Sequence, residues 1–582
     1  AAVYAELGYM RSQRLGKVQF APFQYNPVTG QILFHKRLQV RVQHPGGAVL
    51  RGRPVQEPAS VEETLRNTLL NYDAARAWRS AAPIAAADAG WTPPTPSWRL
   101  HVKQEGVYVV TYEELAQAGV PLYQVDPQTI RLLHDGKEVA IRVVNEAGED
   151  DFDGSFDPGD EIRFYGQGVD EKYTDTNIYW LTYGGASGLR MVRKTGGPNG
   201  TLVSNYPATE HVENNQNYVS TTPRDSDYNH WYGRLLTAVG KNSQDEKTEL
   251  VNLSALASGT YSATLRVALA GRTRGLHHVL LSVNGQQVLD SQWKDTGYYT
   301  FTAQFDQALL QEGANRVSIA LVNDLGIQTV SVAYIDWVEI TYQRQFVAQA
   351  DQLIFDGPGG GLMRYMVTGF SSGDLEAYDV TDPYRVSHLD VETVAGLGSF
   401  TALEQTPRRY LMQRISKRLS VDKITRAMPQ NLRASDLGAD LIVISHPDFL
   451  GAIQPLVDYR IRQGYRVQLV NLLDIYDQFN YGRVSVHAIR AFLAYAYANW
   501  QPPAPAYVLL VGDGTYDPRN YRGDSNPTFI PPYLEIVDLD LGETAADNRY
   551  VTIVGDDNMP DMTLGRFPVE TPAQVTAMVE KT

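Results

Sequence analysis

The residues of this chain whose types and spacing best suit a chemical role lie in an acidic loop at 149–160. Oxygen donors occupy positions 1, 3, 5, 9 and 12 of the loop, and Gly154 at position 6 permits a sharp turn. Calcium is a hard cation that prefers oxygen ligands at this spacing. The sequence therefore predicts a structural calcium site with six candidate ligands, the five residues at these positions and Ser155 at position 7: Glu149, Asp151, Asp153, Ser155, Asp157 and Asp160.

Two features of this loop depart from the usual helix–loop–helix calcium motif. Glu149 stands where Asp is usual, and Asp160 stands where a bidentate Glu is usual. The flanking residues also have the pattern of strands, at 139–144 and 162–165, rather than of helices. A solvated acidic turn between two strands is therefore the alternative interpretation.

A second concentration of acidic residues follows a predicted buried strand at 507–511. Asp513 and Asp517 come directly after that strand, where ligands gather in a doubly wound sheet. The alternative is that these carboxylates cap loops and helix N-termini, and no histidine lies close in sequence to complete a hydrolytic metal site. The other members of the concentration are Asp538, Asp540, Glu543, Asp547, Asp556, Asp557 and Asp561.

Length and composition narrow the class of protein. The chain has 582 residues, or about three to five domains at roughly 150 residues each. It has 66 acidic residues against 51 Lys and Arg, and the net charge of −15 argues against binding to duplex nucleic acid. It has no cysteine, which excludes disulfides, thiolate metal sites and a cysteine nucleophile within these residues. No apolar run is long enough to span a membrane.

The predicted elements place β-rich modules before an α/β unit. Alternating apolar residues and frequent turns favour a β-sandwich or jelly roll at 201–345. From residue 435 the order β-α-β-α-β predicts a doubly wound parallel sheet. The expected domains are a β unit with a helix at 1–79, a linker at 80–97, a β module with the acidic loop at 98–200, the sandwich at 201–345, a β-rich connecting region at 346–434 and the α/β unit at 435–582.

The last predicted helix begins with strong signals. Thr571 is a good N-cap, Pro572 follows at the first helical position, and Gln574 can complete a capping box. The sequence ends at Thr582 without a stop signal for this helix, so we expect it to be the front part of a longer polypeptide. A frayed natural terminus is the alternative.

Several stretches together resemble the gingipain family of secreted bacterial cysteine peptidases and its type IX secretion sortase-like relatives. The most specific is Val511-Gly512-Asp513-Gly514-Thr515-Tyr516-Asp517, and residues 20–30 are similar to the family's propeptide. The resemblance covers most of the chain in order and is strongest over 435–582. Further similar stretches lie at 106–108, 157–160, 176–181, 474–479, 488–493, 547–550, 555–557 and 565–569.

The resemblance implies a cysteine endopeptidase with two caspase-like α/β subdomains, of which the second supplies the catalytic Cys and a His within Gly-His-Gly. This chain contains neither, so no catalytic residue can be assigned. We therefore expect residues 435–582 to be the first, truncated subdomain, with a downstream catalytic subdomain of the same polypeptide as its partner. We also expect secretion or display at the bacterial cell surface, with the signal peptide already removed.

Two other functions remain open at the level of sequence. The chain could be an inactive surface protein of an envelope layer or filament, with protein or glycan contacts. The β-sandwich could instead bind glycans, although a fold alone does not establish a function.

Overall fold

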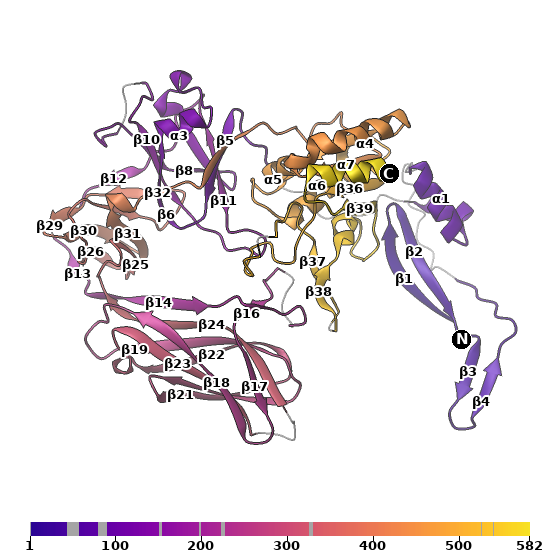
Figure 1. The fold of residues 1–582 in the computed structure, drawn as a ribbon, viewed down its shortest axis with the longest axis horizontal. Coiled ribbons are helices and arrows are strands. Elements are labelled where there is room, and N and C mark those ends of the chain that lie inside the picture. Colours follow the sequence, from indigo (N-terminus) through magenta and orange to yellow (C-terminus); the bar gives the residue numbers. More distant parts are fainter. Residues whose placement is uncertain are drawn as a thin grey trace.

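The structure is a computed structural model that describes residues 2–42, 57–79, 90–150, 154–196, 199–222, 227–324, 330–524, 526–538 and 540–582. It comprises an N-terminal segment (residues 2–79), three β domains and a C-terminal α/β domain (residues 434–582). Figure 1 shows the α/β domain between the β domains and the N-terminal segment. The fold class predicted from the sequence, β-rich modules followed by a doubly wound α/β unit, is confirmed.

The N-terminal segment consists of two hairpins and a short helical region. Residues 27–30 form the turn of the second hairpin, since Asn26 and Gln31 pair across it. The first hairpin was not predicted, and its turn is formed by Arg11 and Ser12. The elements are β1 (Ala2–Met10), β2 (Gln13–Phe20), β3 (Phe23–Asn26), β4 (Gln31–Phe34), α1 (Ala59–Thr68) and α2 (Tyr72–Ala75).

The first β domain packs two sheets around a core that includes Trp98, Leu132 and Phe164. One sheet has the order β32-β6-β10-β9 and the other β33-β5-β11-β7-β8. Its elements are β5 (Ser97–Val102), β6 (Gly106–Thr111), α3 (Tyr112–Gln117), β7 (Arg131–His134), β8 (Lys137–Val139), β9 (Ile141–Val144), β10 (Glu161–Gly166), β11 (Asn177–Thr182), β32 (Leu419–Ser420) and β33 (Lys423–Ala427).

The second β domain is a sandwich at 205–345. One sheet has the order β14-β24-β19-β22, with β17 also on β24, and the other β18-β23-β20-β21. The apolar side chains that alternate along these strands fill the space between the sheets. The strands are β14 (Asn205–Glu213), β15 (Asn217–Tyr218), β16 (Trp231–Tyr232), β17 (Leu235–Val239), β18 (Ser243–Leu253), β19 (Ser262–Gly271), β20 (Leu276–Val283), β21 (Gln286–Lys294), β22 (Gly297–Asp306), β23 (Gly313–Asn323) and β24 (Val330–Gln345).

The third β domain has its own core of packed aromatic rings, which includes Phe355, Tyr365 and Tyr410. Its sheets have the orders β12-β28-β27-β31-β25 and β13-β26-β30-β29. Its strands are β12 (Val192–Lys194), β13 (Thr201–Leu202), β25 (Gln352–Gly357), β26 (Gly361–Val367), β27 (Leu375–Asp379), β28 (Ser387–Leu389), β29 (Glu392–Val394), β30 (Leu397–Glu404) and β31 (Arg408–Arg414).

The β domains are nested rather than consecutive, which differs from the linear division expected from the sequence. Strand β12, from the range expected in the first module, and strand β13, from the start of the range expected in the sandwich, pair with strands of residues 361–389. Strands β32 and β33, from the expected connecting region, complete the two sheets of the first domain. The chain therefore leaves the first domain, builds the other two and returns to finish it.

The α/β domain has a parallel sheet of order β35-β34-β36-β39. Ile442 and Ile444 of β34 face a core on one side, and Val443 faces a second core on the other side. This alternation explains why the strand is apolar from Leu441 to Ile444. The elements are β34 (Leu441–Ser445), α4 (Leu450–Arg462), β35 (Val467–Asn471), α5 (Leu472–Phe479), α6 (Val486–Asn499), β36 (Tyr507–Val511), β37 (Leu534–Asp538), β38 (Gly542–Ala545), β39 (Thr563–Phe567) and α7 (Pro572–Lys581).

Within the described residues, no helix is both long and apolar enough to cross a membrane.

Candidate functional site

The acidic loop predicted to bind calcium joins β9 to β10, so its flanks are strands. Asp151 and Asp153 lie outside the described residues. Of the remaining candidates, the Asp160 carboxylate accepts the backbone N–H of Asp157 at 2.6 Å. The backbone N–H of Glu149 donates to the side-chain oxygen of Asn145 at 3.0 Å. The described residues contain no group of three acidic or histidine side chains arranged around a cation. Calcium binding at this loop therefore remains a prediction.

The acidic residues at the carboxyl end of β36 mainly hold the chain in place. Asp517 accepts the backbone N–H groups of Tyr521 and Arg522, each at 2.9 Å. Asp547 pairs with Arg566 of β39 at 2.7 Å. For these two carboxylates the structure supports the interpretation that they fix loops rather than bind a ligand.

Glu543 differs from the other acidic residues because it joins three domains. Its fully buried carboxylate in β38 contacts the Lys172 ammonium of the first β domain and accepts the Tyr218 hydroxyl of the second at 2.9 Å. The imidazole of His230 lies 3.7 Å away. Burial lowers the pKa of Lys172, and the charge of Glu543 opposes that change. We call these four residues the interdomain cluster.

The loop after β36 is also held by both β domains. Arg519 donates to the carboxylate of Asp170 in the first domain at 2.6 Å. Tyr516 stacks on Trp231 of the second domain, with ring centroids 6.2 Å apart. The β domains therefore restrain the carboxyl edge of the parallel sheet, where ligands of doubly wound folds bind.

A Gly-x-Ser-x-Gly pattern, typical of serine hydrolases, occurs at 369–373. Its serine, Ser371, lies in a turn between strands β26 and β27 rather than between a strand and a helix. The hydroxyl donates to Asp351 at 2.8 Å and accepts from Arg414 at 2.9 Å. Because these partners are a carboxylate and a cation, not a histidine base, this turn is not a nucleophile elbow.

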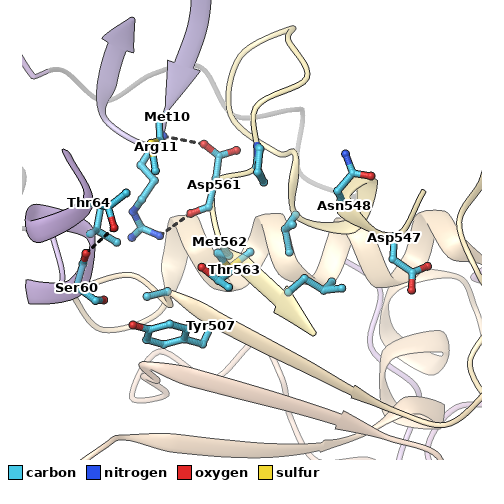
Figure 2. Close-up of a pocket in the computed structure, with 15 residues that line it drawn as sticks. Met10, Arg11, Ser60, Thr64, Tyr507, Asp547, Asn548, Asp561, Met562 and Thr563 are labelled. Carbon is cyan, nitrogen blue, oxygen red and sulfur yellow. Dashed lines mark hydrogen bonds between the residues drawn. The ribbon is translucent and has the colours of Figure 1, made fainter. Parts of the chain in front are cut away.

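The most elaborate polar contact of the N-terminal segment is made by Arg11. Figure 2 shows its side chain reaching from the turn between β1 and β2 to Asp561 of the α/β domain. The guanidinium donates to the carbonyls of Pro505 at 2.7 Å and Asp561 at 2.8 Å, and to Glu57 at 2.6 Å. Burial raises the pKa of Asp561, whereas the backbone N–H groups that donate to it act in the opposite direction. We call this set of contacts the Arg11 site.

A groove of about 460 Å³ lies beside the Arg11 site. Ser60 and Thr64 of α1 form one wall, and Tyr507, Asn548 and residues of β39 lie across from them (Figure 2). The sequence offered no signal for either feature, since Arg11 is one of many arginines and its partners are backbone carbonyls far along the chain.

Comparisons with known proteins bear on both ends of this interface. The model of peptidase family C25 matches residues 434–582. The model of the C25 propeptide matches residues 1–76. Both ends of the chain therefore match models of family C25, and we call the two matched segments the propeptide and the C25 domain. The resemblance to gingipain peptidases drawn from the sequence is confirmed, and the Arg11 site joins the C25 propeptide to the C25 domain.

Solved structures extend the comparison across the β domains. Dimeric latent PorU from Porphyromonas gingivalis is similar over 84% of this chain and 49% of its own, with 18% identity and a TM-score of 0.58. The chain thus spans about half the length of that protein, and the likeness shows a shared fold. No curated protein sequence matches the chain.

Smaller modules also align, with lower scores. A CBM36 carbohydrate-binding module matches 18% of this chain and 77% of its own at 18% identity and a TM-score of 0.14. A family 35 module from Clostridium thermocellum matches 23% and 95% at 14% identity and 0.15. TM-scores this low say nothing about what the chain binds.

Proposed function

We propose that this chain is the non-catalytic front part of a C25 cysteine endopeptidase. It supplies the propeptide, three accessory β domains and the first of two α/β subdomains. The observation that carries the proposal is the presence of both C25 segments in one chain that has no cysteine. Peptide-bond cleavage by this family's chemistry needs a thiolate and an imidazole within hydrogen-bond reach, and these residues cannot provide the thiolate.

The partner we propose is a second, catalytic α/β subdomain of the same polypeptide. The half-length coverage of PorU supports it, because that relative extends well beyond the part shared with this chain. The strand β39 also supports it: within the described chain it pairs only with β36, so its other edge is open to further structure.

The test compares the 582-residue chain with the longer gene product on casein and on Arg and Lys reporter peptides. We expect no turnover from the chain and thiol-dependent turnover from the longer product, abolished when its catalytic cysteine is replaced by alanine. Hydrolysis by the 582-residue chain that survives chelators and scales with its concentration would overturn the proposal.

We propose secretion or cell-surface display for the same protein. The support is the resemblance to a family of secreted peptidases together with the acidic, cysteine-free composition. Recovery of the native protein only from the cytoplasmic fraction of its host would contradict this.

We also propose a structural calcium ion at the 149–160 loop. The support is the spacing of its oxygen donors, and the position of the loop between two strands of one sheet gives a bound ion a role in holding that turn.

A further inference from the structure

The turn of the first hairpin is buried while the strands that carry it are exposed. Arg11, Ser12 and Gln13 are 1%, 4% and 4% exposed. In contrast, most residues of β1 and β2 are open to solvent, including Val3 at 68% and Phe20 at 52%. The C25 domain therefore contacts this hairpin mainly at its tip, with a further hydrogen bond from the backbone N–H of Tyr9 in β1 to Asp557 at 2.6 Å.

The tip presents one side chain whose shape the C25 domain matches. The three guanidinium nitrogens of Arg11 all donate, and the acceptors beyond those given above include the carbonyl of Ala504 at 3.2 Å. The ring of Tyr497 lies 4.8 Å from the guanidinium carbon, a cation–π distance. A planar fork of donors suits this arrangement, whereas the single ammonium of a lysine cannot reach all of these acceptors.

Most of the site is held by contacts that do not involve Arg11. The second carboxylate oxygen of Asp561 accepts the backbone N–H groups of Ile553 at 2.9 Å and Val554 at 2.8 Å. Arg466 donates to the carbonyls of Pro502 and Pro503, which directly precede Ala504 and Pro505 in the chain. Only Glu57 comes from the propeptide, so the remaining acceptors stay in place without it.

The position of the site separates it from the edge where catalysis is expected. Ala504 and Pro505 precede β36, and Asp561 precedes β39, so the site lies at the amino ends of these parallel strands. Ligands of doubly wound sheets bind at the carboxyl ends. An arginine held here cannot also fill a substrate pocket at the opposite edge.

We propose that the acceptors of the Arg11 site form a binding site for an arginine side chain on a tight turn. This site binds the propeptide at the edge of the parallel sheet opposite to the edge where catalysis is expected. Removal of the propeptide leaves a site that accepts a guanidinium ligand from solution. The proposal rests on the proposed function only for the name of the segment that is held, since binding is measured without any peptidase activity.

The test uses the full 582-residue chain with Arg11→Ala and methylguanidinium as the probe. At about ten times its Kd, we expect methylguanidinium to raise the Tm of the C25 domain of this variant by about 3 °C. Arg14→Ala is the matched control, because Arg14 lies on the same hairpin but pairs with Glu6 at the surface. Methylguanidinium should not raise the Tm of this control or of the wild type, and methylammonium should not raise the Tm of Arg11→Ala.

A second variant keeps the test decisive if Arg11→Ala does not fold. Arg11→Lys retains the charge but loses the fork, so limited proteolysis should release its hairpin at least ten times faster than that of the wild type. A hairpin held equally well by lysine, or equal effects of methylguanidinium on the Arg11 and Arg14 variants, would overturn the proposal. A third outcome is that the Arg11→Ala chain responds to methylguanidinium while the longer gene product shows no peptidase activity. That combination would support the arginine site and contradict only the proposed function.

Discussion

Replacing Glu543 by glutamine tests whether the interdomain cluster joins the C25 domain to the β domains. Glutamine keeps the size of the side chain and can still accept the Tyr218 hydroxyl, so the change removes only the negative charge. The Lys172 side chain is 6% exposed and would lose its carboxylate. Breaking a buried ion pair by removing one partner costs about 3–5 kcal/mol.

We expect the lower end of that range for this variant. Burial already lowers the pKa of Lys172, so the ammonium can release its proton once Glu543 is neutral and thereby limit the penalty. A loss of about 3 kcal/mol corresponds to a roughly 150-fold increase in local opening. The opening should be confined to the contact between the β37–β38 hairpin and the second β domain.

Hydrogen exchange of backbone amides measures this opening directly, because it reports local as well as global unfolding. The amide of Glu543 donates to the carbonyl of Ser220 across the interface at 2.8 Å, so it is the most informative reporter. Its exchange at pH 7 should accelerate about 150-fold, while amides in α4 should not change. Glu535→Gln is the matched control, because this residue lies in the same hairpin and is only partly buried.

Two results would refute this reasoning. One is an acceleration of less than about fivefold at the Glu543 amide, which would place the cost well below that of a broken buried pair. The other is an equal effect of Glu535→Gln. Adding Lys172→Met to Glu543→Gln should restore much of the protection, since removal of both charges leaves no buried ion to solvate.

Burial raises the pKa of Asp474 to about 6, so this residue stabilises the fold below its unfolded pKa and the contribution is lost as pH rises through 6. The free energy of unfolding of the C25 domain should therefore fall by up to about 3 kcal/mol between pH 4 and 7, and Asp474→Asn should remove this dependence in denaturation curves measured over that range. Arg99→Leu leaves Asp477 buried without its cation, which should lower the free energy of local opening at the contact between the first β domain and α5 by about 3–5 kcal/mol. Hydrogen exchange of amides at this contact should accelerate accordingly, and an unchanged rate would contradict this. Calcium should raise the Tm of the first β domain relative to EGTA in the wild type but not in Asp153→Ala, and identical midpoints in all four conditions would remove the calcium proposal.

The sequence predicted the α/β domain well because its signals are local. The run at 441–444 is apolar throughout, as a strand covered on both faces requires. Thr571 and Gln574 form the predicted capping box at the start of α7, with Pro572 in the first turn. Such signals depend on neighbouring residues only, so the pattern in the chain is sufficient to identify them.

The nested β domains and the Arg11 site could not be predicted because their signals are not local. Strands β13 and β32 have two residues each, which is too short to show any periodicity. Their pairing is decided by which edges remain open after the longer strands have packed. Likewise, the partners of Arg11 are mainly backbone carbonyls, which every residue has, so residue type carries no information about them.

The return of the chain to the first β domain affects how this protein can be made and divided. His101 pairs with Lys423, about 320 residues later, and at about 5–20 residues per second a ribosome needs tens of seconds to cover that interval. Until then β5 and β6 each lack one neighbour and offer an unpaired edge to other chains. A fragment that contains every strand of the first domain must therefore run from residue 97 to residue 427 and include the second and third β domains.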